Sequence, residues 1–183
     1  MRTRLAIPED ARAIAEVHVR SWQAAYATIL DPAFLAGLSA QRRALGWQAA
    51  LGAGESTTVV GEKDGQVVAF VSYGACRDEG APAHRGEIWA IYAIPQAWGT
   101  GVGRQLLHDA LAALRTAGKS DCTLWVLADN ARGLDFYRRA GFQQVPDSGK
   151  VFDLGGRQVQ EVQLRLDLRA SARPPAGQAR PDK

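Results

Sequence analysis

The architecture of this chain is built around residues 87–117, which read EIWAIYAIPQAWGTGVGRQLLHDALAALRTA. The apolar run 88–94 is too short for a globular helix and is rich in β-forming residues, so it predicts a strand that is buried on both faces. Pro95 ends this strand because it cannot donate to a ladder. The helix that follows has one apolar side, and Gly118 ends it. That side is formed by Val102, Leu106, Ala110, Ala113, Leu114 and Ala117.

Gly99, Gly101 and Gly103 lie between this strand and this helix. Glycines allow backbone N–H groups to turn inward and approach a phosphate, and the start of a helix adds its partial positive charge. The segment therefore predicts a binding site for a phosphate or pyrophosphate group.

Two kinds of phosphate site do not match these glycines. A Walker loop needs a Lys after its last glycine, and none follows here, so a kinase or ATPase is disfavoured. A dinucleotide fingerprint needs a third glycine at its sixth position. That position holds Arg104 when counted from Gly99 and Leu106 when counted from Gly101, so a dinucleotide-dependent oxidoreductase is disfavoured as well.

Gln96, Gly99 and Gly101 form the pattern Q-x-x-G-x-G, which resembles the phosphate-binding motif of the GNAT superfamily of acyl-CoA N-acyltransferases. A second segment strengthens the resemblance. After a further apolar strand at 122–127, residues 128–142 read ADNARGLDFYRRAGF, and the family has a similar helix at this distance from the glycine loop.

Asn130 and Tyr137 are the residues of this second helix that match the family pattern. They are two helical turns apart and therefore lie on nearly the same side. Asp129 is the predicted N-cap of the helix, and Gly141 ends it.

The resemblance implies a GNAT-like α/β (α+β) fold, with a mixed, mostly antiparallel sheet of six to seven strands and helices on both faces. The strands at 88–94 and 122–127 would be parallel neighbours at its centre, joined by the intervening helix. In the family these two strands splay at one end, where the pantetheine arm of coenzyme A enters. By the resemblance, the backbone groups that it uses belong to Ile91, Tyr92 and Ala93.

The other elements follow from local patterns. We expect a strand at 3–7, a helix that starts at 8–10, a break at Asp31-Pro32 and a second helix to about residue 51. Asp64-Gly65 predicts a hairpin between strands 57–62 and 66–73. Closing strands are expected at 142–145 and 159–166. In the latter, Val162, Leu164 and Leu166 share one side, and Val159 and Glu161 share the other.

The length of 183 residues, 46% of them hydrophobic, suits one domain with a real core, placed at 1–168. Residues 169–183 are rich in Pro, Ala and Gly and are expected to form a disordered tail. Of the net charge of +3, all three charges belong to that tail, so the predicted domain is neutral. No basic face is expected, which argues against a nucleic-acid partner.

No apolar run approaches the roughly 20 residues that cross a bilayer, and the N-terminus has no apolar signal region, so we expect a cytoplasmic protein without a membrane partner. Cys76 and Cys122 are far apart and are expected to be free thiols. His18, His84 and His108 show no ligand spacing, so no metal is expected.

The resemblance assigns the phosphate contacts to the glycine loop. The backbone N–H groups of Gly99, Thr100, Gly101, Val102, Gly103 and Arg104 would donate to the pyrophosphate of acetyl-CoA, with Gln96 as part of the motif. The Arg104 side chain could pair with a phosphate or be an ordinary exposed Arg at a helix start. Asn130 could bond the pantetheine arm, cap its helix, or do both.

Acetyl transfer requires a neutral amine, a stabilised oxyanion and a proton for the departing thiolate. Tyr137 is the candidate general acid; the alternative is a core tyrosine packed on Phe136 and Phe142. Glu87 is the candidate general base, directly or through a water, and shares the strand parity of Trp89 and Ile91. Its alternative is a strand-end carboxylate paired with Arg85 in solvent.

Four aromatic residues are candidates for the acceptor site: Trp22, Tyr26, Trp89 and Tyr92. They could hold a cationic amine by cation–π contacts, or they could be core residues at helical and strand spacing. Trp125 stands where some protein-acetylating relatives have a glutamate base, which weakens the hypothesis that the acceptor is the N-terminus of a ribosomal protein.

The resulting hypothesis is a cytoplasmic N-acetyltransferase that transfers the acetyl group of acetyl-CoA directly to a primary amine of a small molecule, such as an amino acid, a polyamine or an amine-bearing antibiotic. Acetylation of a protein N-terminus or lysine, or a non-catalytic acyl-CoA sensor on the same fold, stay open as alternatives. The sequence does not determine the oligomeric state; a homodimer is compatible with the resemblance. Acceptor choice is expected to depend on the loops at 28–38 and 77–85.

Overall fold

The computed structural model describes residues 1–169 of the chain, so the expected tail lies outside the described residues except for Arg169. Five α-helices are present in the described part: α1 (Ala11–Ala25), α2 (Pro32–Ala36), α3 (Ala40–Ala53), α4 (Val102–Thr116) and α5 (Ala131–Arg139). Short 3-10 helices precede α1 and α4, namely η1 (Pro8–Asp10) and η2 (Pro95–Ala97). The strands are β1 (Arg2–Leu5), β2 (Ser56–Lys63), β3 (Gln66–Ala75), β4 (Arg85–Ala93), β5 (Asp121–Leu127), β6 (Gln143–Gln144), β7 (Lys150–Leu154) and β8 (Arg157–Asp167).

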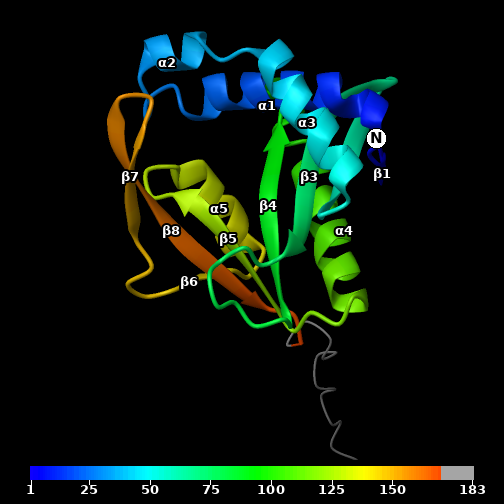
Figure 1. The fold of residues 1–183 in the computed structure, drawn as a ribbon, viewed down its shortest axis with the longest axis vertical. Helices are drawn as coiled ribbons and strands as arrows, with labels where there is room; N and C mark the ends of the chain where they lie inside the picture. Colours follow the sequence, from blue (N-terminus) through cyan, green and yellow to red (C-terminus); the bar gives the residue numbers. More distant parts are fainter. Residues whose placement is uncertain (170–183) are drawn as a thin grey trace, which may run out of the picture.

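All of these strands form one mixed sheet with the order β1-β2-β3-β4-β5-β8-β6, and β7 pairs with β8 beside this path (Figure 1). Every pairing is antiparallel except that of β4 with β5, as expected for the fold class. The sheet of the described residues has eight strands, one more than the upper expected number. The additional strand is β7. Its residues are mostly exposed and show no apolar alternation, and the tight turn at Gly155-Gly156 brings it beside β8.

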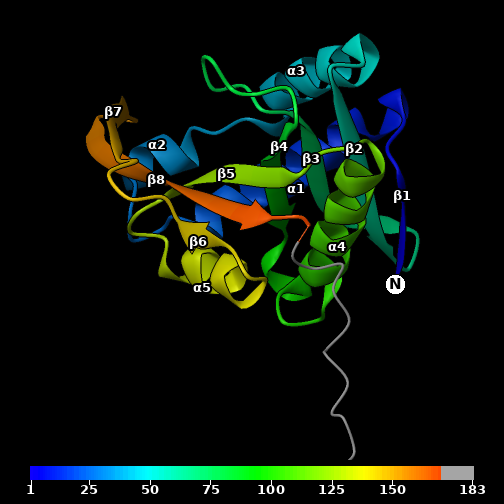
Figure 2. The same ribbon diagram turned by 90° about the horizontal axis from the view of Figure 1, so that it is seen from below.

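Helices cover both faces of the sheet, and Figure 2 shows α3 on one side and α4 and α5 on the other. Side-chain contacts agree with this view. Phe70 packs against Trp47 of α3 with ring centroids 4.9 Å apart. A Cβ on Gly61, which is paired with the neighbouring Ala69, would lie 2.6 Å from Val102 of α4. Adjacent positions on β3 thus contact helices on opposite faces, as the strand period of two requires.

The helical region before β2 differs from the prediction of two helices. After the break at Asp31, whose carboxylate accepts from the amides of Ala33 and Phe34, α2 is only one turn long. A third helix begins after Ser39, because the Ser39 hydroxyl accepts from the amide of Arg42 at 3.2 Å and caps it. A polar Ser after Gly37 is therefore a second start signal within what was taken as one helix.

Helices α4 and α5 follow the prediction with two corrections. The apolar side of α4 is buried as expected, but Ala117 lies beyond its last turn and is exposed. Gly118 ends the helix with φ +78°. The N-cap of α5 is Asn130, not Asp129, since its side-chain oxygen accepts from the amide of Gly133 at 3.0 Å.

The pairing of β4 with β5 is short. It covers three residue pairs, from Arg85↔Asp121 to Glu87↔Thr123, and beyond these positions the strands diverge. At the closed end, the buried carboxylate of Asp121 accepts from Nε of Arg85 at 2.6 Å and lies 3.2 Å from Nη2 of Arg165 on β8. The predicted splay is therefore present, and ion pairs close one end of it.

A β-bulge changes which residues of β4 share a face. The ladder with β3 passes from Ser72↔Ala90 to Tyr73↔Ile88, so Trp89 is inserted without a partner of its own. The alternation of side chains reverses there, and Glu87 lies on the same face as Tyr92 rather than Ile91. The predicted parity of Glu87 with Ile91 was therefore wrong, because a bulge cannot be read from strand alternation.

Candidate active site

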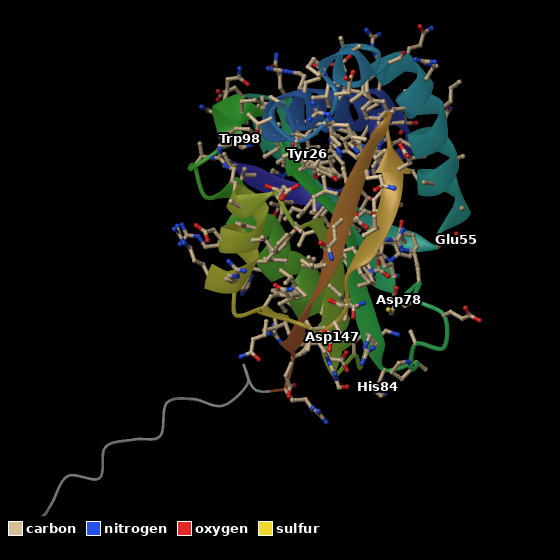
Figure 3. All side chains as sticks on the ribbon, turned by 90° about the vertical axis from the view of Figure 1, so that its left-hand side faces the viewer. Tyr26, Glu55, Asp78, His84, Trp98 and Asp147 are labelled. Carbon is tan, nitrogen blue, oxygen red and sulfur yellow. The ribbon has the colours of Figure 1, made fainter. Side chains whose placement is uncertain are left out.

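The splay between β4 and β5 opens into a cleft of about 1270 Å³. We call the part lined by the glycine loop, α4 and α5 the donor half. The acceptor half is lined by the end of α1, residues 77 and 78, β5, and the β7–β8 hairpin. Tyr26 and Trp98 both lie toward the end of the molecule that α1 crosses (Figure 3). The cleft is thus open between the two central strands and is reached by residues far apart in sequence.

The glycine loop forms one wall of the donor half. Gly99 has φ +75° and Gly101, the N-cap of α4, has φ +92°, conformations that favour glycine. The amides of the first turn of α4 have no partners within the helix and begin at the cleft wall. Gly103 lies against α5, where a Cβ would be 3.6 Å from the ring of Phe136. A compact anion at this helix start would meet free N–H groups; that a phosphate binds there stays a prediction.

Two residues of the predicted motif have other partners. The Gln96 side-chain oxygen accepts from Nη2 of Arg20 at 3.0 Å, and Gln96 does not line the cleft. Thr100 also lies outside the lining residues, and both its amide and its hydroxyl donate to the carbonyl of Ala97. These contacts shape the loop from behind instead of contributing donors to the cleft.

Arginine side chains surround the donor half. Its lining includes Arg104, Arg115, Arg132 and Arg139, whereas Asp135 is the one carboxylate among the described residues that line this half. Coenzyme A carries several phosphate charges, so this donor half has the charge that the ligand requires.

Trp98 and Arg132 join the glycine loop to the first turn of α5, and neither was predicted as a site residue. The Arg132 guanidinium lies 3.8 Å from the centre of the Trp98 ring. The Trp98 indole N–H donates to the carbonyl of Ala93 at 2.8 Å. Ile91, Tyr92 and Ala93 all line the cleft, but the Ala93 carbonyl is already used by this bond.

Tyr137 lines the cleft from α5, and Asn130 lines it from the start of the same helix. The Tyr137 ring makes edge-on contacts with Phe136 and Phe142, with centroids 5.2 and 5.8 Å away. Its hydroxyl makes no hydrogen bond with the described residues. Burial raises the pKa of Tyr137 above that of an ordinary tyrosine, so the phenol stays protonated at neutral pH. The packing and the catalytic interpretation are therefore compatible.

Glu87 is buried with only 2% of its surface exposed, and Arg77 holds its carboxylate. The Arg77 amide donates to Oε2 at 2.7 Å, and its Nε and Nη2 donate to Oε1, the former at 3.0 Å. The expected alternative partner, Arg85, pairs with Asp121 instead. Both oxygens of Glu87 thus accept hydrogen bonds from Arg77.

The four predicted acceptor residues all line the cleft. Trp22 contacts Tyr26 edge-on at 5.2 Å, and Tyr92 stacks on His18 at 4.8 Å. Burial raises the pKa of Tyr26 and of Tyr92, so both hydroxyls stay neutral. Both tryptophans already have an arginine over the ring: Arg77 lies 4.5 Å from the centre of the Trp89 ring, and Arg43 lies 4.7 Å from that of Trp22.

Comparison with known proteins agrees with this geometry. The family model described as "Acetyltransferase (GNAT) family" matches residues 14–142. The uncharacterised N-acetyltransferase YuaI of Bacillus subtilis is 30% identical over 156 residues, which are 85% of this chain and 87% of that protein. The chain belongs to the GNAT acetyltransferase family. It is therefore an acyl-CoA-dependent acetyltransferase, with acetyl-CoA as its acyl donor.

Solved structures show the same GNAT fold. The ribosomal-protein-alanine N-acetyltransferase of Brucella melitensis superposes with a TM-score of 0.72 at 23% identity, over 91% of this chain and 99% of that one. The structure of yncA from Salmonella typhimurium, solved with its cofactor acetyl-CoA, has a TM-score of 0.70 at 23% identity, over 100% of this chain and 98% of that one.

Sequence reasoning missed several charged residues of the acceptor half of this GNAT protein: Arg77, Asp78, Lys150 and Glu161. Three of them lie on loops or on the unpredicted β7 and gave no motif. Glu161 gave no signal either, since it shares one side of its strand with Gln163 and Arg165 while the other side is apolar, the usual pattern of a solvent-facing carboxylate.

Two further features concern metal ions and membranes. Within residues 1–169, no group of three or more His, Cys, Asp and Glu side chains is arranged to hold a metal ion. The helices of this part of the chain are all too short or too polar to cross a bilayer.

Proposed function

We propose that this protein transfers the acetyl group of acetyl-CoA directly to a primary amine of a small molecule. The observation that carries the proposal is the division of one continuous cleft into two chemically different halves. Arginines and unpaired helix-start amides line the donor half, whereas the acceptor half is lined by aromatic rings and by three carboxylates that outnumber its two cations, Arg77 and Lys150. A polyanionic donor and a cationic acceptor can then meet at the splay without either leaving its own half.

The donor half has a group for each part of coenzyme A. The amides of Val102, Gly103 and Arg104 would donate to the pyrophosphate, and the guanidinium groups of Arg104 and Arg132 would balance its charge. The backbone groups of Ile91 and Tyr92 that face the splay would bond the extended pantetheine arm, because β5 has already diverged from β4 there.

Tyr137 would donate the proton that the departing sulfur needs. Its raised pKa keeps the proton in place until a thiolate develops beside it. Glu87 stays a prediction as the general base, and it would have to act through a water or release Arg77 first. The contacts of Glu87 support a second role, in which it anchors the loop that carries Arg77 and Asp78 to β4.

The choice of a small molecule over a protein as acceptor is part of the proposal. The Brucella melitensis structure is that of a ribosomal-protein-alanine N-acetyltransferase, so a protein N-terminus is the main alternative. Trp125 argues for a small acceptor, because it stands where some protein-acetylating relatives have a glutamate base. Lys150 lies over its ring, 3.6 Å from the centre. A homodimer and a cytoplasmic location stay predictions.

A thiol-release assay tests the proposal. Acetyl-CoA is supplied with a panel of amino acids, polyamines, monoamines and short peptides, and at least one small amine should give turnover. Coenzyme A binding without turnover on any acceptor would favour the sensor, and turnover with peptides alone would favour the protein acetyltransferase.

The proposed acid is tested by Tyr137→Phe, which removes the phenol while keeping the ring contacts. We expect kcat to fall by about 10²–10³-fold, in the range of general acid catalysis, with coenzyme A affinity within a few-fold of wild type. An unchanged kcat and pH–rate profile would show that the sulfur receives its proton from elsewhere.

A further inference from the structure

Glu161 is the charged residue of the acceptor half that has no partner. It lies on β8 between Leu127 of β5 and Lys150 of β7 in the sheet register, and its side chain lines the cleft. Its carboxylate makes no hydrogen bond and no ion pair with the described residues, although it is partly buried. Burial raises the pKa of Glu161, an effect that Lys150 and Arg77 oppose through their charges.

The absence of a partner is notable because a suitable one is directly opposite. Lys150 is the cross-strand neighbour of Glu161, and opposite charges at such positions ordinarily pair. Instead Nζ of Lys150 lies 3.3 Å from Oδ1 of Asp78 and over the Trp125 ring. The Trp125 indole N–H donates to the same Oδ1 at 3.1 Å, so Asp78 draws Lys150 away from Glu161.

The charges of the acceptor half therefore do not balance. Two cations, Arg77 and Lys150, line it together with three carboxylates: Asp78, Glu87 and Glu161. Arg77 is held by Glu87 and Lys150 by Asp78. One negative charge is left over, and it belongs to Glu161.

The surroundings of this charge suit an organic cation. Tyr26, directly after α1, and Tyr92, on β4, line the same cleft as Glu161, and the charge of Glu161 adds to the burial that raises their pKa values. Tyr137 of α5, the proposed acid, lines this cleft as well. The two tyrosines are neutral. Lys150 and Arg77, the cations whose charges act on Glu161, are each paired with another carboxylate. No free cation among the described residues lines this part of the cleft.

We infer that Glu161 binds the ammonium group of the incoming acceptor, and that the acceptor class is a small amine with a single positive charge and an apolar or aromatic body. This ammonium gives up one proton, to the Glu161 carboxylate or to a water beside it, before the neutral nitrogen attacks the thioester. The inference rests on the proposed function and narrows its acceptor. The rings of Tyr26 and Tyr92 would contact the body of the amine and its cationic end, and Trp22, whose ring already has Arg43 over it, would contact the body. A polyamine would bring its further charges close to Arg77 and Lys150, which disfavours it.

The test is a pair of probes that differ in charge alone. Phenethylamine is cationic at neutral pH, and 2-phenylethanol has nearly the same shape without the charge. Calorimetry on the full chain saturated with coenzyme A should give at least tenfold tighter binding of the amine by the wild type. Glu161→Gln should remove this preference and leave coenzyme A affinity within twofold. Asp153→Asn, which removes an exposed carboxylate of the same hairpin outside the cleft, should keep the preference.

Retention of the preference in Glu161→Gln, or equal or no binding of the two probes by the wild type, would overturn the inference. A second measurement needs no variant: amine binding by the wild type should weaken as the pH falls and Glu161 gains a proton, while alcohol binding should not. A flat pH dependence for the amine would count against Glu161. Failure of the proposed function would show separately, as absent thiol release from acetyl-CoA with every amine.

Discussion

His18 shows how one largely enclosed side chain can change the pH dependence of the whole fold. It lies on α1 among the rings of Trp22, Trp47, Phe70 and Tyr92, and its Nδ1 accepts from the Trp47 indole at 3.3 Å. Burial, helped by the charge of Arg43, lowers the pKa of His18 to about 3. In the unfolded chain it titrates near its ordinary value of about 6.5.

Stability should therefore fall with acid in a window set by His18. Below pH ~6.5 the imidazole of His18 binds a proton in the unfolded chain, whereas in the folded protein it binds one only near pH 3. The free energy of unfolding should therefore fall by up to about 1.4 kcal/mol per pH unit between these values. His18→Asn keeps an acceptor for Trp47 and removes the titration. Urea unfolding at pH 7, 5 and 4 should show a shallower loss of stability in this variant. Parallel losses in both proteins would contradict the assignment.

Among the residues of the site, those within local motifs could be predicted and those that depend on distant partners could not. Gly101, Asn130 and Tyr137 lie in continuous patterns of strand, loop and helix, and all three line the cleft. The capture of Glu87 by Arg77 could not be foreseen, because it depends on the conformation of a loop. The role of Glu161 depends on a contact between Lys150 and Asp78, which are far apart in sequence.

The closed end of the splay is a junction of elements as well as of charges. Asp121 begins β5, and its side chain joins Arg85 of β4 to Arg165 of β8. His84, just before β4, lies 3.5 Å from the same carboxylate. Three segments of the chain therefore depend on one buried acid for their spacing.

Asp121→Asn should consequently cost more than an ordinary ion pair. Removing one partner of a buried pair leaves cations without compensation, but Arg165 is about half exposed, so we expect a loss of about 2–3 kcal/mol in unfolding free energy. Asp135→Asn, which breaks the exposed pair with Arg139 on α5, is the matched control and should cost less than about 0.5 kcal/mol. Denaturant unfolding measures both. Equal losses would show that the junction does not hold the strands.

Elements defined by short-range signals were predicted well, and those defined by the tertiary structure were not. The strand, glycine loop and helix around Gly101 were correct because apolar period, proline and glycine all act locally. The bulge at Trp89 and strand β7 were missed since each exists only against a neighbouring strand. The additional helix start at Ser39 was missed although the capping signal was present.

At the scale of the molecule, the net charge of zero over residues 1–168 conceals an uneven distribution of charges over the cleft. Residues 1–168 were correctly counted as neutral, yet four arginines line the donor half against one carboxylate of the described lining residues. Composition cannot reveal this, because α4 and α5 bring the arginines together only after folding. The inference that there is no broad basic face does not exclude a basic pocket.

Coenzyme A binding should accordingly depend on salt. Since the arginines are partly exposed and act over several ångströms, raising KCl from 50 to 500 mM should weaken binding by roughly tenfold. Arg132→Gln should weaken binding at low salt and reduce this dependence, whereas Arg138→Gln on the outer side of α5 should do neither. Calorimetry at the two salt concentrations measures both variants. An unchanged salt dependence in Arg132→Gln would remove that side chain from the phosphate contacts.

The short β4–β5 pairing also bears on how the sheet is completed. Beyond Glu87, the side of β4 that faces β5 has no ladder partner among residues 1–169, although it lies in the middle of the molecule and not at its rim. Unpaired strand edges ordinarily attract another extended chain. Here the pantetheine arm of acetyl-CoA would be that chain. The edge of β4 would then be paired only while the cosubstrate is bound, and it would be exposed again each time the product coenzyme A leaves.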